Sequence, residues 1–353
     1  MVKISEIIKT LEPRWFMPSM ATGAVGVALS FFNIPKIIPA IFVYLAIFFF
    51  ILTFIIYFVR IFAFTEEVIK DLTHPVANNF FAAIYISVGV LITGVLNVLL
   101  KYNYLNKSFA LFLAKLFYLI GLIFLLILVI AIPLINYLSE KVDTKHSLGI
   151  WFLPPVGIFV FIFAGNFLAM HNVFREFILL INPLLMGLAF VWWFIRMNFI
   201  FYRIKFHPLP PPEMAPSFVI GLAPIGVSVI ATLTFGLLTK NELILSLAKG
   251  FGVLIYGFGL WWASIVLGIL TYYLIKHKIK YSLGFWAFVF PPAAFAIGAK
   301  LLANSLEEYN TFFNFVFYVF AIIATIAWIY VFYKTLIGII TGKAFERPKT
   351  LKN

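Results

Sequence analysis

The sequence predicts an all-α polytopic membrane protein. Of its 353 residues, 64% are hydrophobic and only 11% are charged, whereas soluble domains are about half apolar and about a quarter charged. The mean hydropathy is +1.08. Apolar runs long enough to cross a hydrocarbon layer of about 30 Å recur along the whole chain, with short polar segments between them. Each run is expected to form a helix, because a helix satisfies its own backbone in lipid.

Ten such runs are present, and each is predicted to be one transmembrane helix. Their expected boundaries are 15–32, 37–59, 80–100, 109–132, 148–170, 177–195, 215–238, 250–275, 281–301 and 312–333. The segment before them lacks the apolar core of a signal peptide, and its isoleucines fall at the spacing of a short surface helix. The chain is therefore expected to have an N-terminal segment, one ten-helix transmembrane domain and a basic tail, at 1–14, 15–333 and 334–353.

Lysine and arginine are distributed unequally between the two sides of the membrane. With ten spans both termini lie on one side, and 18 of the 26 basic residues fall on that side. The positive-inside rule therefore places the N-terminal segment and the tail in the cytoplasm of a cell-membrane protein. This orientation accounts for the net charge of +13. Because the basic residues form no separate soluble domain, the lipid bilayer is the expected partner and nucleic acid is not.

Prolines distinguish the odd-numbered spans from the even-numbered ones. A proline inside a helix frees backbone carbonyls, which lipid tolerates only against protein or a water-filled cavity. The odd spans therefore are expected to face inward around a central pore, each forming a helical hairpin with the even span after it. The alternative is a solid bundle with packing kinks. Span 3 carries small and polar residues instead, and the other odd spans carry Pro18, Pro154, Pro155, Pro216, Pro224, Pro291 and Pro292.

Ionisable residues inside the spans are few. Only Lys115, Arg196 and Lys300 qualify, and each lies near a span end, from which a long basic side chain extends to the membrane surface. For Lys300, at the outer end of span 9, the second hypothesis is that it draws anions into a pore mouth. No acidic residue lies in the middle of a span, which disfavours a cation pathway and a carrier built on a membrane carboxylate. An apolar, aromatic route with basic mouths fits a weakly hydrated or organic anion.

Signatures of enzymes are scarce in this chain. There is no cysteine, and the five histidines fall in loops or at span ends without the spacing of a metal site. No P-loop or GxSxG motif is present. We therefore expect no catalytic residue, metal or cofactor. An intramembrane enzyme acting on lipid is the competing class, and it requires acidic or histidine clusters that are missing; a non-transporting scaffold gives no reason for the prolines.

Four segments together resemble one known family, the tellurite-resistance/dicarboxylate transporters, which include bacterial TehA, fungal malic acid transporters, sulfite efflux pumps and plant slow anion channels. The likeness covers essentially the full chain. "PRWFMPSMATGAVGV" (13–27) is similar to the family's first span, and "RIFAFTEEVIKDLTHPVANNFFAAI" (60–84) to its loop before span 3. "WFLPPVGIFVFIFAGN" (151–166) resembles span 5, and "FWAFVFPPAAFAIGA" (285–299) resembles span 9. The order and spacing of the four make the match specific.

The resemblance implies a homotrimer with one five-helix pore in each subunit and transport of small anions, as a channel or a carrier. C4-dicarboxylates such as malate are the first expected substrates, and sulfite or monovalent anions are the second. The resemblance also implies that Phe290, directly before Pro291, closes the pore at mid-membrane. It assigns His74, Pro75 and Arg60 a structural role in a cytoplasmic loop. Further pore-lining candidates from the other inner helices are Phe16, Phe81, Phe152 and Phe218.

Overall fold

The computed structural model describes residues 3–276, 279 and 281–346, and in this part of the chain every regular element is a helix. Nine helical segments of the described residues are long and apolar enough to cross a membrane. The first predicted span, 15–32, is helical over 13–29 and is shorter than these nine. The protein is thus an all-α polytopic membrane protein, as the sequence predicts, with a helix count near ten.

Each odd-numbered span begins as a 3-10 helix and continues as an α-helix. α5 also ends in a π-helical turn, η3 (Val95–Leu100). The five pairs are η1 (Pro13–Phe16) with α2 (Met17–Leu29), η2 (Ala77–Phe81) with α5 (Ala82–Gly94), η5 (Gly149–Phe152) with α7 (Leu153–Met170), η6 (Pro212–Gly221) with α9 (Leu222–Thr239), and η7 (Leu283–Phe288) with α11 (Phe290–Ser305).

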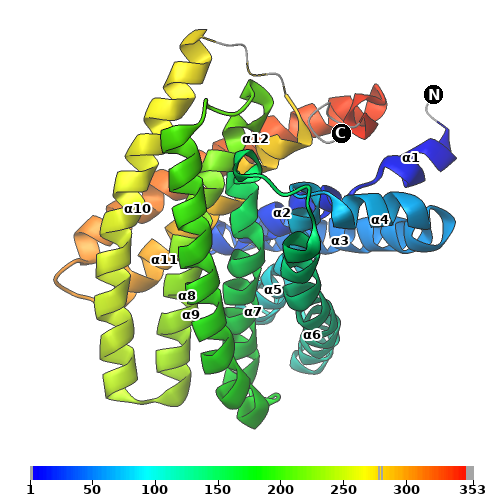
Figure 1. Ribbon diagram of the computed structural model, residues 1–353. Helices are drawn as coiled ribbons and strands as arrows, with labels where there is room; N and C mark the ends of the chain where they lie inside the picture. The colour runs from blue at the N-terminus through cyan, green and yellow to red at the C-terminus, as the bar shows by residue number, and fades with distance from the viewer. Residues whose placement is uncertain (1–2, 277–278, 280, 347–353) are drawn as a thin grey trace.

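The even-numbered spans are long continuous α-helices, and each packs on the inner helix before it. They are α3 (Ile37–Ala63), α6 (Lys107–Leu138), α8 (Arg175–Phe206), α10 (Glu242–Lys276) and α12 (Asn310–Ile340). Figure 1 shows one such hairpin, α9 and α10, joined by a short turn at the lower edge. Most of these outer helices extend beyond the predicted boundaries. A helix can continue past its first charged residue when that long side chain reaches the membrane–water interface.

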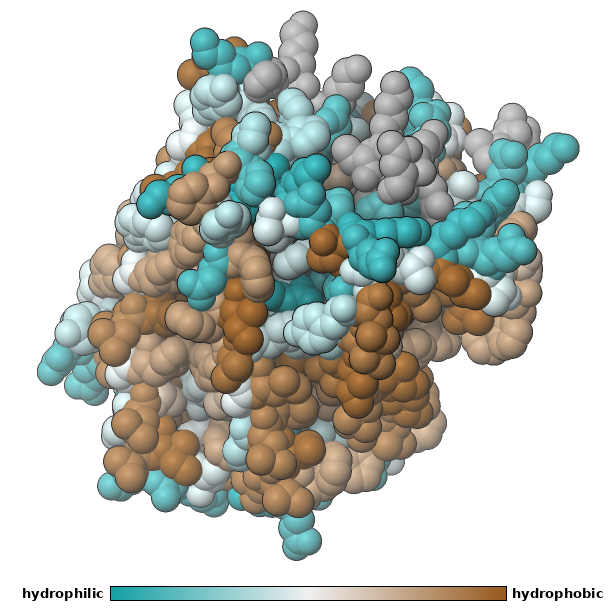
Figure 2. All heavy atoms as spheres, in the orientation of Figure 1, coloured by the Kyte–Doolittle hydropathy of each residue, from teal (hydrophilic) through white to brown (hydrophobic). Residues whose placement is uncertain are grey.

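The inner α-helices form a closed ring. α2 packs on α5, α5 on α7, α7 on α9, α9 on α11, and α11 on α2. Four of the inner spans are long enough to cross a membrane, and 78–94% of an apolar 18-residue stretch in each is buried. In the outer helices the buried share of such a stretch is only 22–33%. In Figure 2 hydrophobic side chains accordingly cover the middle and lower part of the molecule, and hydrophilic ones gather along the upper edge and at the lower tips. The predicted division into inner and outer helices is therefore observed.

All of the prolines predicted inside the odd-numbered spans except Pro216, which lies inside η6, mark the change from 3-10 to α-helix. This differs from the mid-helix kink that the sequence suggested. Pro18 has no N–H for the carbonyl of Arg14, and that carbonyl instead accepts the N–H of Met17. In the same way Pro154 has no N–H to donate to the carbonyl of Ile150, and that carbonyl accepts the N–H of Leu153. Each of these prolines lies in the first turn of its α-helix, where no N–H is required.

The 3-10 segments also form a ring, with η1, η2, η5, η6 and η7 packed in that order and η7 against η1. A 3-10 helix is narrower than an α-helix, and glycine lets two of these segments touch. A Cβ at Gly149 would lie 1.8 Å from the carbonyl oxygen of Ser217, which is impossible without a backbone shift. We call this end of the molecule the 3-10 end, and the opposite end, where each inner helix turns into the next outer helix, the hairpin end.

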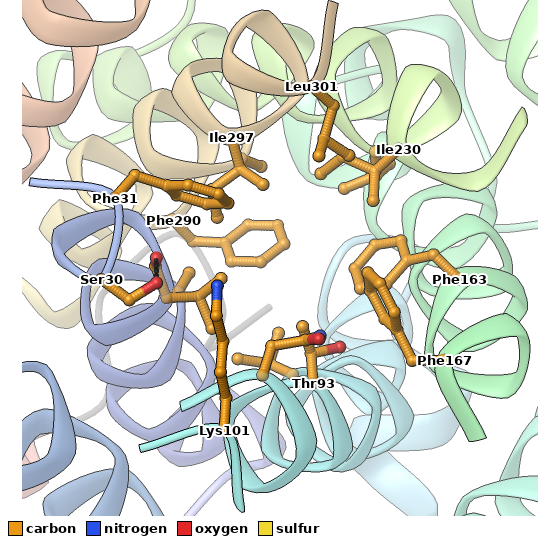
Figure 3. Close-up of a pocket in the computed structure, with 16 residues that line it drawn as sticks. Ser30, Phe31, Thr93, Lys101, Phe163, Phe167, Ile230, Phe290, Ile297 and Leu301 are labelled. Atoms are coloured by element: carbon orange, nitrogen blue, oxygen red, sulfur yellow. Dashed lines mark hydrogen bonds between the residues drawn. The ribbon is translucent and has the colours of Figure 1, made fainter. Parts of the chain in front are cut away.

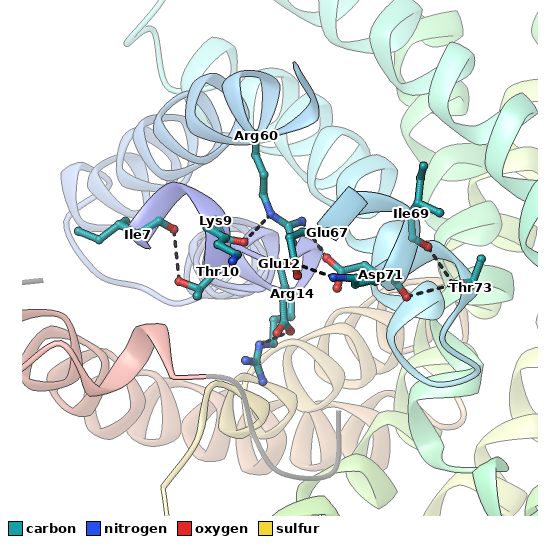
Figure 4. A network of polar contacts seen from close by, with 11 residues as sticks. Ile7, Lys9, Thr10, Glu12, Arg14, Arg60, Glu67, Ile69, Asp71 and Thr73 are labelled. Carbon is teal, nitrogen blue, oxygen red and sulfur yellow. Dashed lines mark hydrogen bonds and ion pairs between the residues drawn. The ribbon is translucent and has the colours of Figure 1, made fainter. Parts of the chain in front are cut away.

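Buried ionic contacts fasten the N-terminal segment to the 3-10 end (Figure 4). Arg60 of α3 pairs with Asp71 of α4 (Thr65–Thr73), with Nη1 2.8 Å from Oδ2 and both side chains buried. Its Nε also donates to the carbonyl of Lys9 in α1 (Ile4–Thr10), at 3.0 Å. Next to it the Nδ1 of His74 accepts the N–H of Val76 and begins η2. These contacts give Arg60 and His74 the structural role that the resemblance implied.

Candidate functional site

A cavity of about 180 Å³ lies inside the ring of inner helices, toward the hairpin end (Figure 3). Its lining comes from all five inner spans and from no outer helix. The side chains are Ala24, Val27, Ser30, Phe31, Val90, Thr93, Asn97, Lys101, Phe163, Phe167, Val227, Ile230, Phe290, Ala294, Ile297 and Leu301. Because five helices from distant parts of the chain converge on it, the cavity is the most plausible place for a solute in this fold.

Phe290 lies at the boundary between this cavity and the 3-10 end. It is the first residue of α11, it is 2% exposed, and its ring lies in the middle of the helix ring in Figure 3. Pro291 and Pro292 follow it and begin the α-helix there. The other rings before the prolines point elsewhere: Trp286 donates to the hydroxyl of Thr335 on α12, at 3.1 Å.

The cavity carries little charge. Among its lining residues Lys101 is the one ionisable side chain, and Figure 3 shows its amine reaching toward the centre. The amine also lies 5.4 Å from the ring centroid of Tyr102. The hydroxyl of Thr93 donates to the carbonyl of Gly89, at 2.9 Å. A single cation in apolar surroundings, with no carboxylate in the lining, attracts an anion and repels a cation.

The 3-10 end encloses only about 30 Å³ on the other side of Phe290. Each 3-10 segment or the turn beside it contributes to the lining, so this space lies on the same axis as the larger cavity. Arg14 and Glu213 line it, and Arg14 pairs with Glu12 at 3.0 Å. The hydroxyl of Ser217 has no hydrogen-bond partner among the described residues. This end therefore carries charged side chains of both signs, and it is nearly closed.

Four of the predicted pore-lining phenylalanines lie away from both spaces. Phe16 is fully buried against the rings of Phe50 and Tyr57 on α3. Phe81 contacts the same tyrosine, with ring centroids 6.2 Å apart. The remaining two, Phe152 and Phe218, are buried in η5 and η6. Of the predicted aromatic positions, the structure brings only Phe290 into the lining of the cavity.

Lys300 also lies outside the lining. Its Nζ donates to Oδ1 of Asn314 on α12, at 2.7 Å, and lies 5.6 Å from the ring of Phe317. Sequence reasoning missed Lys101, although it follows span 3 directly and is the residue that reaches the cavity. It also missed Phe163 and Phe167, whose i, i+4 spacing on α7 places them on one helix face. In the described residues no group of three histidine, aspartate or glutamate side chains could hold a metal ion.

Comparison with known proteins agrees with this geometry. The family model described as voltage-dependent anion channel matches residues 10–336. An uncharacterized transporter of Methanocaldococcus jannaschii is 28% identical over 340 residues, which cover 92% of this chain and 96% of the relative. A second uncharacterized transporter of that organism is also 28% identical, over 84% of this chain and 85% of its own length. A sulfite efflux pump of Arthroderma benhamiae is 21% identical over 96% of this chain and 93% of the pump.

Proposed function

The chain belongs to the voltage-dependent anion channel family, and on this premise we propose that its helix ring is an anion pathway closed by the side chain of Phe290. The match confirms the resemblance inferred from the four sequence segments. It makes the protein a multi-pass membrane transporter or channel for anions and not an enzyme. The closure at Phe290, the substrate and the assembly are proposals.

One observation carries the closure. The larger cavity is lined by all five inner helices and ends at Phe290, beyond which only about 30 Å³ of space remains. An ion that passes this point must lose water against a phenyl ring, and an unpaired charge in apolar surroundings is costly. Movement of one side chain, or of the turn between η7 and α11, then controls passage.

Two substrate classes are in question. C4-dicarboxylates such as malate follow from the resemblance to the dicarboxylate transporters. Sulfite is favoured by the fungal relatives, which are sulfite efflux pumps. Monovalent anions are favoured by the cavity itself, because Lys101 offers one positive charge and a dicarboxylate carries two negative ones. We therefore place sulfite and monovalent anions ahead of malate.

Flux in proteoliposomes tests both proposals. Malate, succinate, sulfite, nitrate and chloride are compared, with and without a proton gradient, for the wild type and Phe290→Ala. We expect Phe290→Ala to raise the flux of the preferred anion at least tenfold, whereas Phe112→Ala, on the exposed face of α6, leaves it unchanged. Unchanged flux in a correctly folded Phe290→Ala protein rejects the closure, and a larger malate flux than sulfite flux reverses the substrate order.

For the assembly we propose a homotrimer in the cell membrane with cytoplasmic termini. Gly250, Gly257 and Gly268 fall on one face of α10, and among the described residues no atom beyond the adjacent helix backbone lies within 4 Å of a Cβ at any of them. A face of small residues lets another helix approach closely in lipid. The mass of the purified particle tests this contact: Gly257→Leu is expected to dissociate the trimer. A monomeric wild type contradicts the trimer, and a trimeric Gly257→Leu contradicts this contact face.

A further inference from the structure

A second cavity, of about 270 Å³, lies at the perimeter of the molecule and shares no residue with the anion pathway. It opens between the C-terminal parts of α6 and α8, beside η4 (Thr144–His146) and η5. Its lining is Pro133, Asn136, Tyr137, Val142, Asp143, Thr144, Ser147, Trp151, Trp192, Ile195, Arg196 and Phe199. Tyr137 and Phe199 are strongly exposed on the outer helices, so the cavity faces the surroundings of the protein.

Arg196 lies in the wall of this cavity and is only 6% exposed. Its guanidinium carbon is 4.6 Å from the ring centroid of Trp192 and 5.5 Å from that of Trp151. Both of its hydrogen bonds come from Nη1, to Oδ1 of Asn79 at 2.6 Å and to the carbonyl of Trp151. Nε and Nη2 therefore have no acceptor among the described residues, although a guanidinium offers five N–H donors.

No carboxylate compensates this charge. None of the ion pairs in the described part of the chain includes Arg196. Arg60, a buried arginine on α3, has Asp71 at 2.8 Å. Burying an arginine without a counter-ion is costly, and the cost is avoided when an external anion occupies the cavity.

Ser147 supplies an independent observation. Its side chain is 1% exposed and lines the same cavity, yet its hydroxyl has no hydrogen-bond partner among the described residues. A buried hydroxyl without a partner destabilises the fold, because it has lost its hydrogen bonds to water. Arg196 and Ser147 thus present unused donors to one space.

One acidic residue also lines the cavity, and its charge is already engaged. Asp143 pairs with the amine of Lys145 at 3.2 Å and accepts the backbone N–H of the same residue at 3.1 Å. That backbone hydrogen bond, with further help from the side chains of Lys145 and Thr144, lowers the pKa of the Asp143 carboxyl to about 2. The negative charge of Asp143 therefore stays with Lys145 on the exposed loop.

We propose that this cavity binds the phosphate group of a membrane lipid. Arg196 and Ser147 donate to the phosphate oxygens, as arginine does at other phosphate sites. The apolar part of the lipid packs on Pro133, Ile195 and Phe199, which extend the cavity toward the hydrocarbon layer. Tryptophan and tyrosine at the opening are the residues enriched at the headgroup level of a bilayer. A free phosphate ion shares the donor chemistry and lacks the apolar contacts.

The test uses the full-length protein, purified in detergent and stripped of lipid. Dioctanoyl phosphatidylglycerol, dioctanoylglycerol and inorganic phosphate are titrated separately, and binding is followed by native mass spectrometry and by the thermal midpoint. We expect the phospholipid to bind and raise the midpoint, and the other two to do neither. Ser147→Asp places a carboxylate against the phosphate and should weaken phospholipid binding at least tenfold. Arg196→Gln should weaken this binding by a similar factor.

Ser147→Asp is the decisive variant, because the hydroxyl that it replaces makes no hydrogen bond to any residue that the structure describes. Ser139→Asp, which adds the same charge before the same loop but outside the cavity lining, is the matched control and should bind like the wild type. Equal phospholipid binding by the wild type and Ser147→Asp overturns the proposal. If inorganic phosphate binds as tightly as the phospholipid, the site is one for soluble anions and the lipid assignment is wrong. None of these readouts depends on anion flux.

Discussion

The two ends of the helix ring differ in helix type and in the space that they enclose. At the hairpin end five α-helices surround about 180 Å³, whereas at the 3-10 end five narrower helices leave about 30 Å³. The same chain segments form both ends, and in four of the five spans a proline lies in the first turn of the α-helix that follows the 3-10 segment. If the helix ring is the anion pathway that we propose, it is closed from Phe290 to the 3-10 end, and its open space lies at the hairpin end.

The largest expected effect concerns what holds the 3-10 end together. Asp71→Ala leaves Arg60 buried without its carboxylate, which typically costs about 3–5 kcal/mol. We expect a large fall in the thermal midpoint of the purified protein, measured by scanning fluorimetry. The exposed pair of Lys70 and Glu67 on the same helix is the control, because Lys70→Ala should change stability by no more than about 1 kcal/mol. Equal effects of the two variants contradict the role given to Arg60.

The next prediction concerns the close contact of η5 and η6. Gly149→Ala forces a methyl group into the carbonyl of Ser217, and overpacking of this kind costs about 1–3 kcal/mol. Gly187→Ala on α8 is the matched control, since no atom lies within 4 Å of a Cβ there. If Gly149→Ala lowers the thermal midpoint in the same fluorimetric assay and Gly187→Ala does not, the 3-10 ring is tightly packed. Tolerance of Gly149→Ala shows that it is not.

Labelling of single cysteines can compare how accessible the two ends are from solution. The natural chain has no cysteine, so each introduced cysteine is the one thiol that reacts. A membrane-impermeant thiol reagent added from the hairpin side should modify Asn97→Cys at least ten times faster than Ser217→Cys. Tenfold corresponds to about 1.4 kcal/mol of barrier. Adding Phe290→Ala to the Ser217→Cys protein should remove most of that difference. Rapid modification of Ser217→Cys with Phe290 in place argues that the phenyl ring is not the barrier.

The smallest effect is expected at the mouth of the cavity. Two unit charges 4 Å apart in bulk water interact by about 1 kcal/mol, so Lys101→Gln should lower anion flux about fivefold at low ionic strength. The loss should shrink at high salt, because salt screens the charge. Lys300→Gln, whose amine is bonded to Asn314 away from the lining, should change neither flux nor its salt dependence. The opposite result assigns anion attraction to Lys300, as the sequence suggested.

The prolines were informative about topology and less so about local geometry. They identified which helices form the inner ring, because an interrupted helix needs protein or a cavity beside it. They did not predict the 3-10 segments, since the fate of a freed carbonyl depends on which N–H comes near it. At Arg14 and Ile150 the donor is the residue just before the proline, which only the folded backbone determines.

By itself the sequence determined the apolar spans, their pairing into hairpins and the inner ring, and the family resemblance supplied the candidate at Phe290. It could not choose among the other phenylalanines, because the inner helices are apolar on every face and periodicity then gives no orientation. Only the tertiary structure turned Phe16 toward α3 and Lys300 toward α12, and brought Lys101 and Phe163 to the cavity. The rotation of each helix is fixed by packing against two neighbours in the ring, and that packing joins residues far apart in the chain.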